Sequence, residues 1–132
     1  ADMYTYDRNT GWPAIVCAAS EGHDEVVRCL MDWGVHPDTV STKGGLSALI
    51  IAAQRGFAST VRLLIDYGAD VNLRDDVACT AVMRACADGQ QECVRVLIEY
   101  GGADWTLKTM GGLDALSWAR SKNHRGIVSM LE

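Results

Sequence analysis

The sequence predicts an all-α protein: a solenoid of stacked helix-turn-helix units from which β-hairpin or loop fingers project. Three observations support this fold class. The chain repeats itself with a period of 33 or 34 residues, each repeat contains two short apolar segments, and a glycine ends the second of them. A period of this length indicates a repeat architecture, because a single helix pair cannot bury its apolar faces and stacked neighbours share one core.

Glycines mark the repeat most clearly. The second apolar segment ends at Gly34, Gly68 and Gly101 in three successive units. Another glycine lies twelve residues before each of these, at Gly22, Gly56 and Gly89. Because glycine adopts the left-handed conformation that ends a helix, we expect the first set to close the second helix of each unit. One extra residue is expected in the loop of residues 34–41, and a second is Gly102.

The second unit shows the two expected helices. Its apolar segments are residues 46–55 and residues 58–67. In the later segment Leu64 and Ile65 follow Val61 by three and four positions, which is the spacing that places side chains on one face of a helix.

Polar residues mark where the first helices begin. Ser47, Thr80 and Asp114 stand at the N-cap position of units two, three and four. A side-chain oxygen there accepts a hydrogen bond from a free backbone N–H. The polar residues 69–79 that follow a second helix are expected to form a projecting loop or tight hairpin.

Composition excludes several classes of protein. A chain of 132 residues with 48% hydrophobic residues suits one globular domain. Its net charge of −5, with no cluster of Lys and Arg, argues against a nucleic-acid partner. The longest apolar run, residues 48–53, is too short to span a bilayer, so no direct membrane insertion is expected.

The cysteines and histidines indicate no chemistry. Five cysteines without a CxxC pair predict neither a disulfide framework nor a metal site, and they favour an intracellular location, cytoplasmic or nuclear. Cys86 and Cys93 are assigned to packing rather than to zinc. No Ser-His-acid arrangement and no phosphate-binding glycine motif is present. We therefore expect no catalytic residue, no metal, no cofactor and no enzyme activity.

Three segments carry a family resemblance. GHDEVVRCLMDWG (residues 22–34), LLIDYGADVN (63–72) and QECVRVLIEYGGAD (91–104) resemble ankyrin repeats. After an N-terminal flank of residues 1–7, the resemblance implies a single ankyrin-repeat domain over residues 8–132. Its repeats would be residues 8–41, 42–74, 75–108 and 109–132, the last one truncated.

The chain departs from the family pattern at the first helix of each unit. The family usually places a Thr-Pro-Leu-His tetrad there, and every unit of this chain lacks the histidine. Since that histidine usually braces the finger, the resemblance implies fingers with fewer bracing bonds.

The resemblance also implies where a protein or peptide partner binds. In the family, partners dock on the finger tips and on exposed positions of the first helices, which form a palm. The finger candidates are Asn9, Thr10, Lys43, Asp76, Val77 and Met110. The candidates at the finger bases are Trp12, Leu46 and Leu113, in a row that also contains Cys79. The palm candidates are Glu21, Gln54, Arg55, Asp88 and Lys122.

Each of these rows has two interpretations. The apolar row at the finger bases forms either an exposed interaction surface or a contact with the neighbouring finger. The charged palm residues alternate in sign, so they form either a ladder of exposed ion pairs or a surface that orients a charged peptide. Arg84 stands opposite Trp118, where it either stacks on the indole ring or reaches a partner.

The expected function is a non-catalytic protein–protein interaction module, a monomeric domain excised from a larger intracellular scaffold, adaptor or regulatory protein. One alternative is a structural spacer or self-association element that uses an apolar edge near Ile127, Val128, Met130 and Leu131. Another is a targeting or regulatory domain of an enzyme or channel, including a reader of basic histone-like tails.

Overall fold

A computed structural model describes residues 11–132 as a stack of helix pairs. The pairs are α1 (Ala14–Ser20) with α2 (Asp24–Asp32), α3 (Ala48–Arg55) with α4 (Ala58–Asp66), α5 (Ala81–Ala87) with α6 (Gln91–Arg95), and α7 (Ala115–Ser121) with α8 (Arg125–Leu131). A π-helical turn, η1 (Val96–Tyr100), continues α6. The described residues contain no strand, only an isolated bridge between Val40 and Ser47. The predicted all-α fold class is confirmed.

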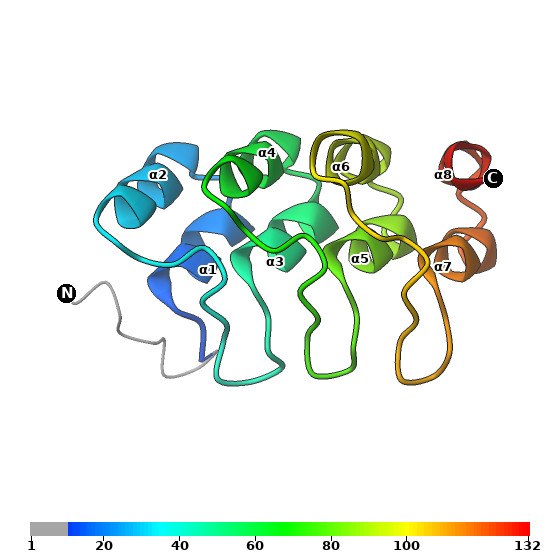
Figure 1. The fold of residues 1–132 in the computed structure, drawn as a ribbon, viewed down its shortest axis with the longest axis horizontal. Coiled ribbons are helices and arrows are strands. Elements are labelled where there is room, and N and C mark those ends of the chain that lie inside the picture. The colour runs from blue at the N-terminus through cyan, green and yellow to red at the C-terminus, as the bar shows by residue number, and fades with distance from the viewer. Residues whose placement is uncertain (1–10) are drawn as a thin grey trace.

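The helices form two layers. Figure 1 shows α1, α3, α5 and α7 in an inner row and α2, α4, α6 and α8 in an outer row. The loops that join successive pairs extend to one side, below the inner row, as fingers. None of the described helices is long and apolar enough to cross a membrane.

The core lies between the layers and between neighbouring pairs. The inner helix α3 buries residues 48–53 completely or nearly so. Small residues such as Ala52 and Ala53 allow neighbouring inner helices to approach closely. Leu64 of α4 and Leu97 of η1 are fully buried from the outer layer. Each such leucine contributes about 1.5–3 kcal/mol, so adjacent pairs stabilise one another.

The predicted N-caps are confirmed. The Ser47 hydroxyl accepts a hydrogen bond from the Ile50 N–H at 3.2 Å, and the Thr80 hydroxyl accepts one from the Met83 N–H at 3.4 Å. Asp114 Oδ1 accepts one from the backbone N–H three residues later at 2.9 Å. These bonds satisfy donors that a helix leaves free in its first turn.

The first extra residue lies elsewhere than predicted. The sequence interpretation places it in residues 34–41. In the structure the Ser41 hydroxyl accepts from the Leu46 N–H, five residues on, whereas Asp75 Oδ1 accepts from the Cys79 N–H, four residues on. The extra residue is therefore between Ser41 and Leu46, in the tip of the finger, where a turn absorbs it without moving either helix.

The second extra residue lengthens a helix. The Gly101 N–H donates to the Val96 carbonyl five residues earlier, at 3.0 Å, which is the π-helical pattern. Gly101 has a φ of −95°, and Gly102 takes the left-handed conformation with a φ of +67°. Gly34 and Gly68 are left-handed as predicted, but Gly101 is not, because the wider turn shifts the helix end by one residue.

The C-terminal edge is less apolar than predicted. Ile127 is 1% exposed and Leu131 is 4% exposed, so both belong to the core. Arg120 and Glu132 form an ion pair at 2.7 Å over this end. Only Val128 and Met130 of the predicted edge are partly exposed.

Candidate interaction surface

The fingers are joined to one another by backbone hydrogen bonds. The Thr42 N–H donates to the Gly11 carbonyl at 2.9 Å, and the Asp76 N–H donates to the Gly44 carbonyl at 3.0 Å. The Met110 N–H donates to the Val77 carbonyl at 3.4 Å. Each finger therefore holds the next in a fixed position.

Apolar side chains are exposed at the last two fingers. Met110 is 80% exposed, Val77 is 50% exposed and Leu113 is 43% exposed. Val77 and Met110 are neighbours because the backbone bond links them. We call Val77, Met110 and Leu113 the fingertip patch.

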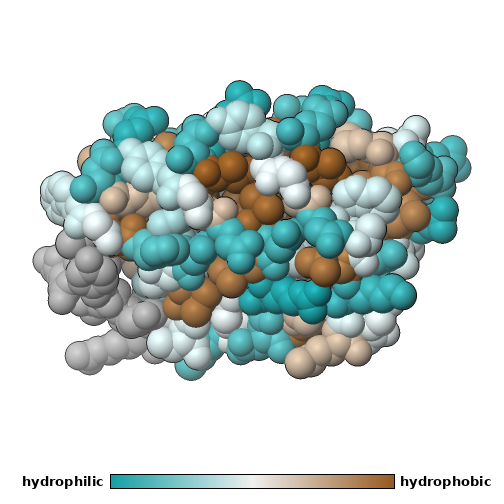
Figure 2. Space-filling model, viewed as in Figure 1, coloured by the Kyte–Doolittle hydropathy of each residue, from teal (hydrophilic) through white to brown (hydrophobic). Residues whose placement is uncertain are grey.

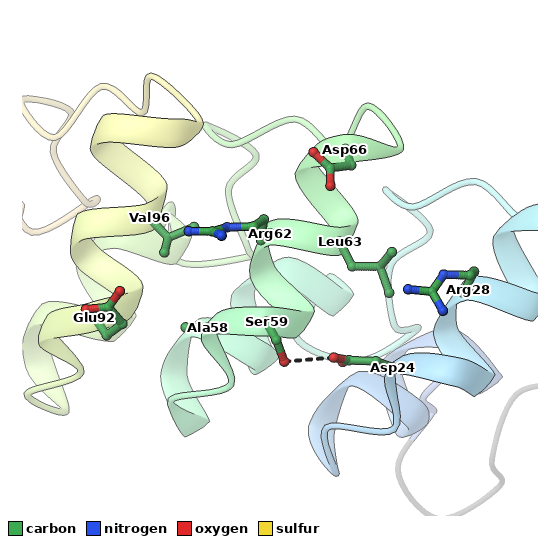
Figure 3. Close-up of a pocket in the computed structure, with 9 residues that line it drawn as sticks. All are labelled: Asp24, Arg28, Ala58, Ser59, Arg62, Leu63, Asp66, Glu92 and Val96. Carbon is green, nitrogen blue, oxygen red and sulfur yellow. Dashed lines mark hydrogen bonds between the residues drawn. The ribbon is translucent and has the colours of Figure 1, made fainter.

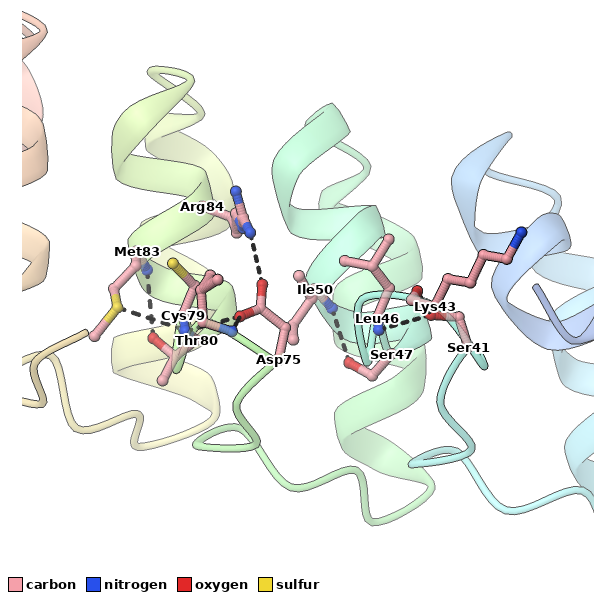
Figure 4. A network of polar contacts seen from close by, with 11 residues as sticks. Ser41, Lys43, Leu46, Ser47, Ile50, Asp75, Cys79, Thr80, Met83 and Arg84 are labelled. Carbon is pink, nitrogen blue, oxygen red and sulfur yellow. Dashed lines mark hydrogen bonds and ion pairs between the residues drawn. The ribbon is translucent and has the colours of Figure 1, made fainter. Parts of the chain in front are cut away.

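Asp75 braces the finger that carries Val77. Its Oδ1 accepts from the Val77 and Cys79 N–H groups, each at 3.0 Å (Figure 4). Its Oδ2 accepts from a guanidinium nitrogen of Arg84 at 2.6 Å. The Asp75 side chain is 1% exposed and that of Arg84 is 32% exposed, so the ion pair is largely shielded from water.

Equivalent side chains brace the other fingers. The Ser41 hydroxyl accepts from the Leu46 N–H at 2.9 Å and donates to the Lys43 carbonyl, and the Thr109 hydroxyl accepts from the Leu113 N–H at 3.2 Å. Both hydroxyls belong to residues of the finger that they brace. The chain thus has bracing bonds that the missing tetrad histidines did not lead us to expect.

Within residues 11–132 the cation–π contact is that of Arg62 with Tyr100, and the Arg84 guanidinium pairs with Asp75 instead of stacking on Trp118. Burial lowers the pKa of its guanidinium, but the hydrogen bond to Asp75 and nearby negative charge outweigh this, so the pKa is raised. Among the described residues, the buried Arg84 Nε and Trp118 Nε1 have no hydrogen-bond partner. The ion pair inside the finger takes the place of the predicted stack on Trp118, and the alternative that Arg84 reaches a partner stays a prediction.

The apolar row at the finger bases is not uniformly exposed. Trp12 and Leu46 are half-buried, Cys79 is 4% exposed, and Leu113 is open to solvent. The alternative of burial against a neighbour therefore applies to Cys79. Leu113 belongs to the fingertip patch.

The palm charges do not form the predicted ladder. Glu21 contacts His23 at 3.0 Å, and Arg55 donates to the Ser20 carbonyl at 3.3 Å. No ion pair within residues 11–132 joins Glu21, Arg55, Asp88 and Lys122 to one another. All four are exposed.

The remaining candidates are placed as follows. Lys43 and Asp76 are exposed on their fingers, and Gln54 is half-buried, with its carbonyl accepting from Gln90 at 3.1 Å. Asn9 and Thr10 lie outside the described residues.

A cavity that sequence reasoning missed lies on the outer layer. It has a volume of about 420 Å³ and is lined by Asp24, Arg28, Ala58, Ser59, Arg62, Leu63, Asp66, Glu92 and Val96. Figure 3 shows Arg62 extending from α4 towards Val96 and Arg28 from α2 towards Leu63. Ser59 donates to Asp24 at 2.7 Å, and Arg62 lies 5.1 Å from the centre of the Tyr100 ring. Asp24, Arg62 and Asp66 of this cavity thus make contacts between units, whereas Arg28 and Glu92 form ion pairs within their own units.

The buried thiols and His124 take part in packing between and within the units. Burial raises the pKa of Cys86 to about 12 and that of Cys93 to about 11, which makes both thiols unreactive at neutral pH. His124 Nε2 lies 3.1 Å from the Ala87 carbonyl of the preceding unit. Residues 11–132 contain no group of three or more His, Cys, Asp or Glu placed to hold a metal ion.

Comparison with known proteins agrees with this architecture. A family model described as ankyrin repeats (3 copies) matches residues 1–75 and 72–132, which together span the chain. No curated protein matches the chain. The chain belongs to the ankyrin-repeat family.

Proposed function

We propose that this chain is a non-catalytic module that binds a protein or peptide through its finger tips and the concave groove beside its inner helices. Ankyrin repeats are generally protein–protein interaction modules and generally non-catalytic. The observation that carries the proposal for this chain is the fingertip patch of Val77, Met110 and Leu113, in which apolar side chains are exposed on two fingers that a backbone hydrogen bond joins.

Apolar groups held in one place favour binding. Removing Met110, 80% exposed, from water on contact with a partner releases free energy of about 25 cal/mol per Å² of apolar area. The finger-to-finger bonds and the Asp75 brace position this patch before a partner arrives. Little conformational entropy is then lost on binding.

Exposed charged residues on the fingers and at the C-terminal ends of the inner helices favour a partner with both apolar and charged groups. Lys43 and Asp76 are exposed on the fingers, and Arg55 and Asp88 are exposed at the ends of α3 and α5. Exposed charges of this kind contribute more to orientation and association rate than to affinity.

We also propose the wider setting: one domain over residues 8–132, monomeric, part of a larger polypeptide in the cytoplasm or nucleus, with no nucleic-acid partner. The net charge of −5 supports the last point, because it repels phosphate.

The test is quantitative capture from cell lysate with mass-spectrometric identification. Wild type is compared with Val77→Asp/Met110→Asp, and with Ser129→Asp as a control, since Ser129 is exposed on α8 in the outer row, away from the fingers. We expect a partner that wild type and the control retain and the finger variant loses by about tenfold or more. Circular dichroism confirms equal folding of the three chains.

A second variant, Trp12→Ala/Arg55→Ala, probes the groove. Loss of the same partner with both double variants places it across fingers and groove. Equal capture by wild type and both double variants would contradict the proposal and favour a spacer role.

A further inference from the structure

Helix α2 carries an exposed apolar face. Val26 is 49% exposed, Trp33 is 70% exposed, and Cys29 between them is also exposed. The spacing of three and four residues places them on one side of the helix. We call Val26, Cys29 and Trp33 the α2 open face. Figure 1 shows α2 as the first helix of the outer row, with α4 beside it on one side and no described helix of that row on the other.

The same positions are buried in the next outer helix. Thr60 and Leu63 of α4 correspond to Val26 and Cys29, and they are 0% and 9% exposed. The Thr60 hydroxyl donates to Asp24 of α2, and the Tyr67 hydroxyl, at the position of Trp33, donates to Asp32 at 2.5 Å.

The third unit repeats this interface. Cys93 and Val96 are 1% and 4% exposed at the positions of Val26 and Cys29. The Tyr100 hydroxyl donates to Asp66 of α4. This face is therefore an interface between units wherever a preceding unit is described, and α2 presents it unoccupied by any described residue.

We propose that the α2 open face packs against the outer helix of a further ankyrin unit, supplied by the same polypeptide ahead of Ala1. The proposal continues an interface that already occurs between α2 and α4 and between α4 and η1. It concerns the outer layer and is independent of binding at the fingers.

A sequence match supports the same polypeptide as the source. Ala69-Asp70 and Ala103-Asp104 directly follow the left-handed glycines that close two outer helices, and their alanines are 9% and 7% exposed. Ala1-Asp2 is the same dipeptide. Residues of the kind that follow an outer helix are thus present ahead of the first described finger.

The face also specifies the chemistry of the incoming helix. Asp32 and Asp66 accept from a tyrosine of the next unit near the end of each helix. Trp33 brings an indole N–H to that position, so it requires an acceptor such as a carboxylate there. Val26 replaces the hydroxyl of Thr60, so the start of the incoming helix needs no counterpart of Asp24.

A second copy of this chain is the less suitable occupant. Its last outer helix, α8, ends at Leu131, and Glu132 follows at the position that Met31 and Ile65 hold in the other units. That helix would bring a carboxylate to a position where the other units carry an apolar side chain.

The experiment measures alkylation of Cys29. The natural polypeptide that contains residues 1–132 is treated with iodoacetamide in its native state, alongside the isolated 132-residue chain, and modified peptides are quantified by mass spectrometry. Cys93 is the internal control, because it is 1% exposed in the described stack and becomes reactive only when the stack unfolds. We expect Cys29 to react at least about tenfold more slowly in the natural polypeptide.

Two further measurements identify the segment that covers the α2 open face. We expect peptides from ahead of Ala1 to contain a helix-ending glycine preceded by an acidic residue. Trp33→Lys should restore fast alkylation of Cys29 in the natural polypeptide and leave the isolated chain unchanged.

Three results would overturn the proposal. One is equal alkylation of Cys29 in both proteins. Another is a natural polypeptide with no unit ahead of Ala1. The third is protection of Cys29 in the isolated chain that disappears on dilution, which would assign the face to a second copy.

Discussion

Asp75 shows how much one side chain contributes to a finger. Its carboxylate accepts hydrogen bonds from two backbone N–H groups and from Arg84, and it is 1% exposed. Truncating it leaves two donors unsatisfied and a half-buried guanidinium unpaired.

We expect Asp75→Ala to lower the free energy of unfolding by about 3 kcal/mol, measured by urea denaturation. Arg84→Ile is the paired variant, since Ile51 holds the same position in the preceding inner helix. The double variant should cost less than the sum of the single ones, with a coupling of about 1–3 kcal/mol. Strict additivity would show that the pair does not act as a unit.

Asp114 is the one N-cap among the three predicted ones that titrates in acid. The Ser117 backbone N–H lowers the pKa of this carboxyl, and the Ser117 hydroxyl lowers it further. The folded pKa is below the unfolded value, so the carboxylate stabilises the fold above its unfolded pKa of about 3.9. This contribution is lost as the pH falls through the folded pKa.

We expect Asp114→Ala to cost about 1 kcal/mol at neutral pH and progressively less below about pH 4. Ser47→Ala is the matched control, because its hydroxyl does not titrate and its cost should not change with pH. Unfolding by denaturant across this pH range checks both. A deficit for Asp114→Ala as large at about pH 3 as at neutral pH would contradict the assignment.

At the scale of elements, the π-helical turn of η1 is the one irregularity among the described helices. It holds the extra residue of the third unit and still lets Tyr100 reach Asp66. The consequence is that the glycine with positive φ is Gly102, in open space, whereas Gly101 lies against Val71 and Ile65.

Substitutions at Gly102 test this register. Gly102→Ala should lower the free energy of unfolding by about 1–2 kcal/mol, because alanine is strained at a φ of +67°. Gly102→Asn should cost less, since asparagine tolerates this conformation. Gly111→Ala is the control at a glycine whose added Cβ meets only Thr109 Oγ1, at 3.8 Å. Urea denaturation compares them, and equal effects of Gly102→Ala and Gly111→Ala would be evidence against the π-helical register.

At the scale of the whole molecule, each helix pair is stabilised by packing against its neighbours. Figure 2 shows hydrophobic areas among the hydrophilic side chains of one face of the stack. Residues at equivalent positions therefore differ according to what lies beside them. Thr60 is fully buried, and Val26, the more apolar residue, is 49% exposed.

The candidate site was predictable only in part. Alignment of the units identified Val77, Met110 and Leu113 as candidates, and these are the exposed apolar residues of the last two fingers. The same alignment could not distinguish Cys79, which is buried in that row, because burial depends on the neighbouring finger.

The sequence by itself determined what local chemistry controls: the period, the helix pairs, the caps at Ser47, Thr80 and Asp114, and the closing glycines Gly34 and Gly68. Side-chain oxygens at an N-cap and glycines at positive φ act within one turn of the chain, so their effect can be predicted from the local sequence.

The tertiary structure alone decided the partner of Arg84, the two places that absorb the extra residues, and the exposure of the α2 open face. Each of these depends on atoms that come close only when neighbouring units stack. Asp75 lies nine residues from Arg84 and reaches it only because the finger folds back onto α5. A repeated sequence specifies equal units, and packing against unequal neighbours makes them different.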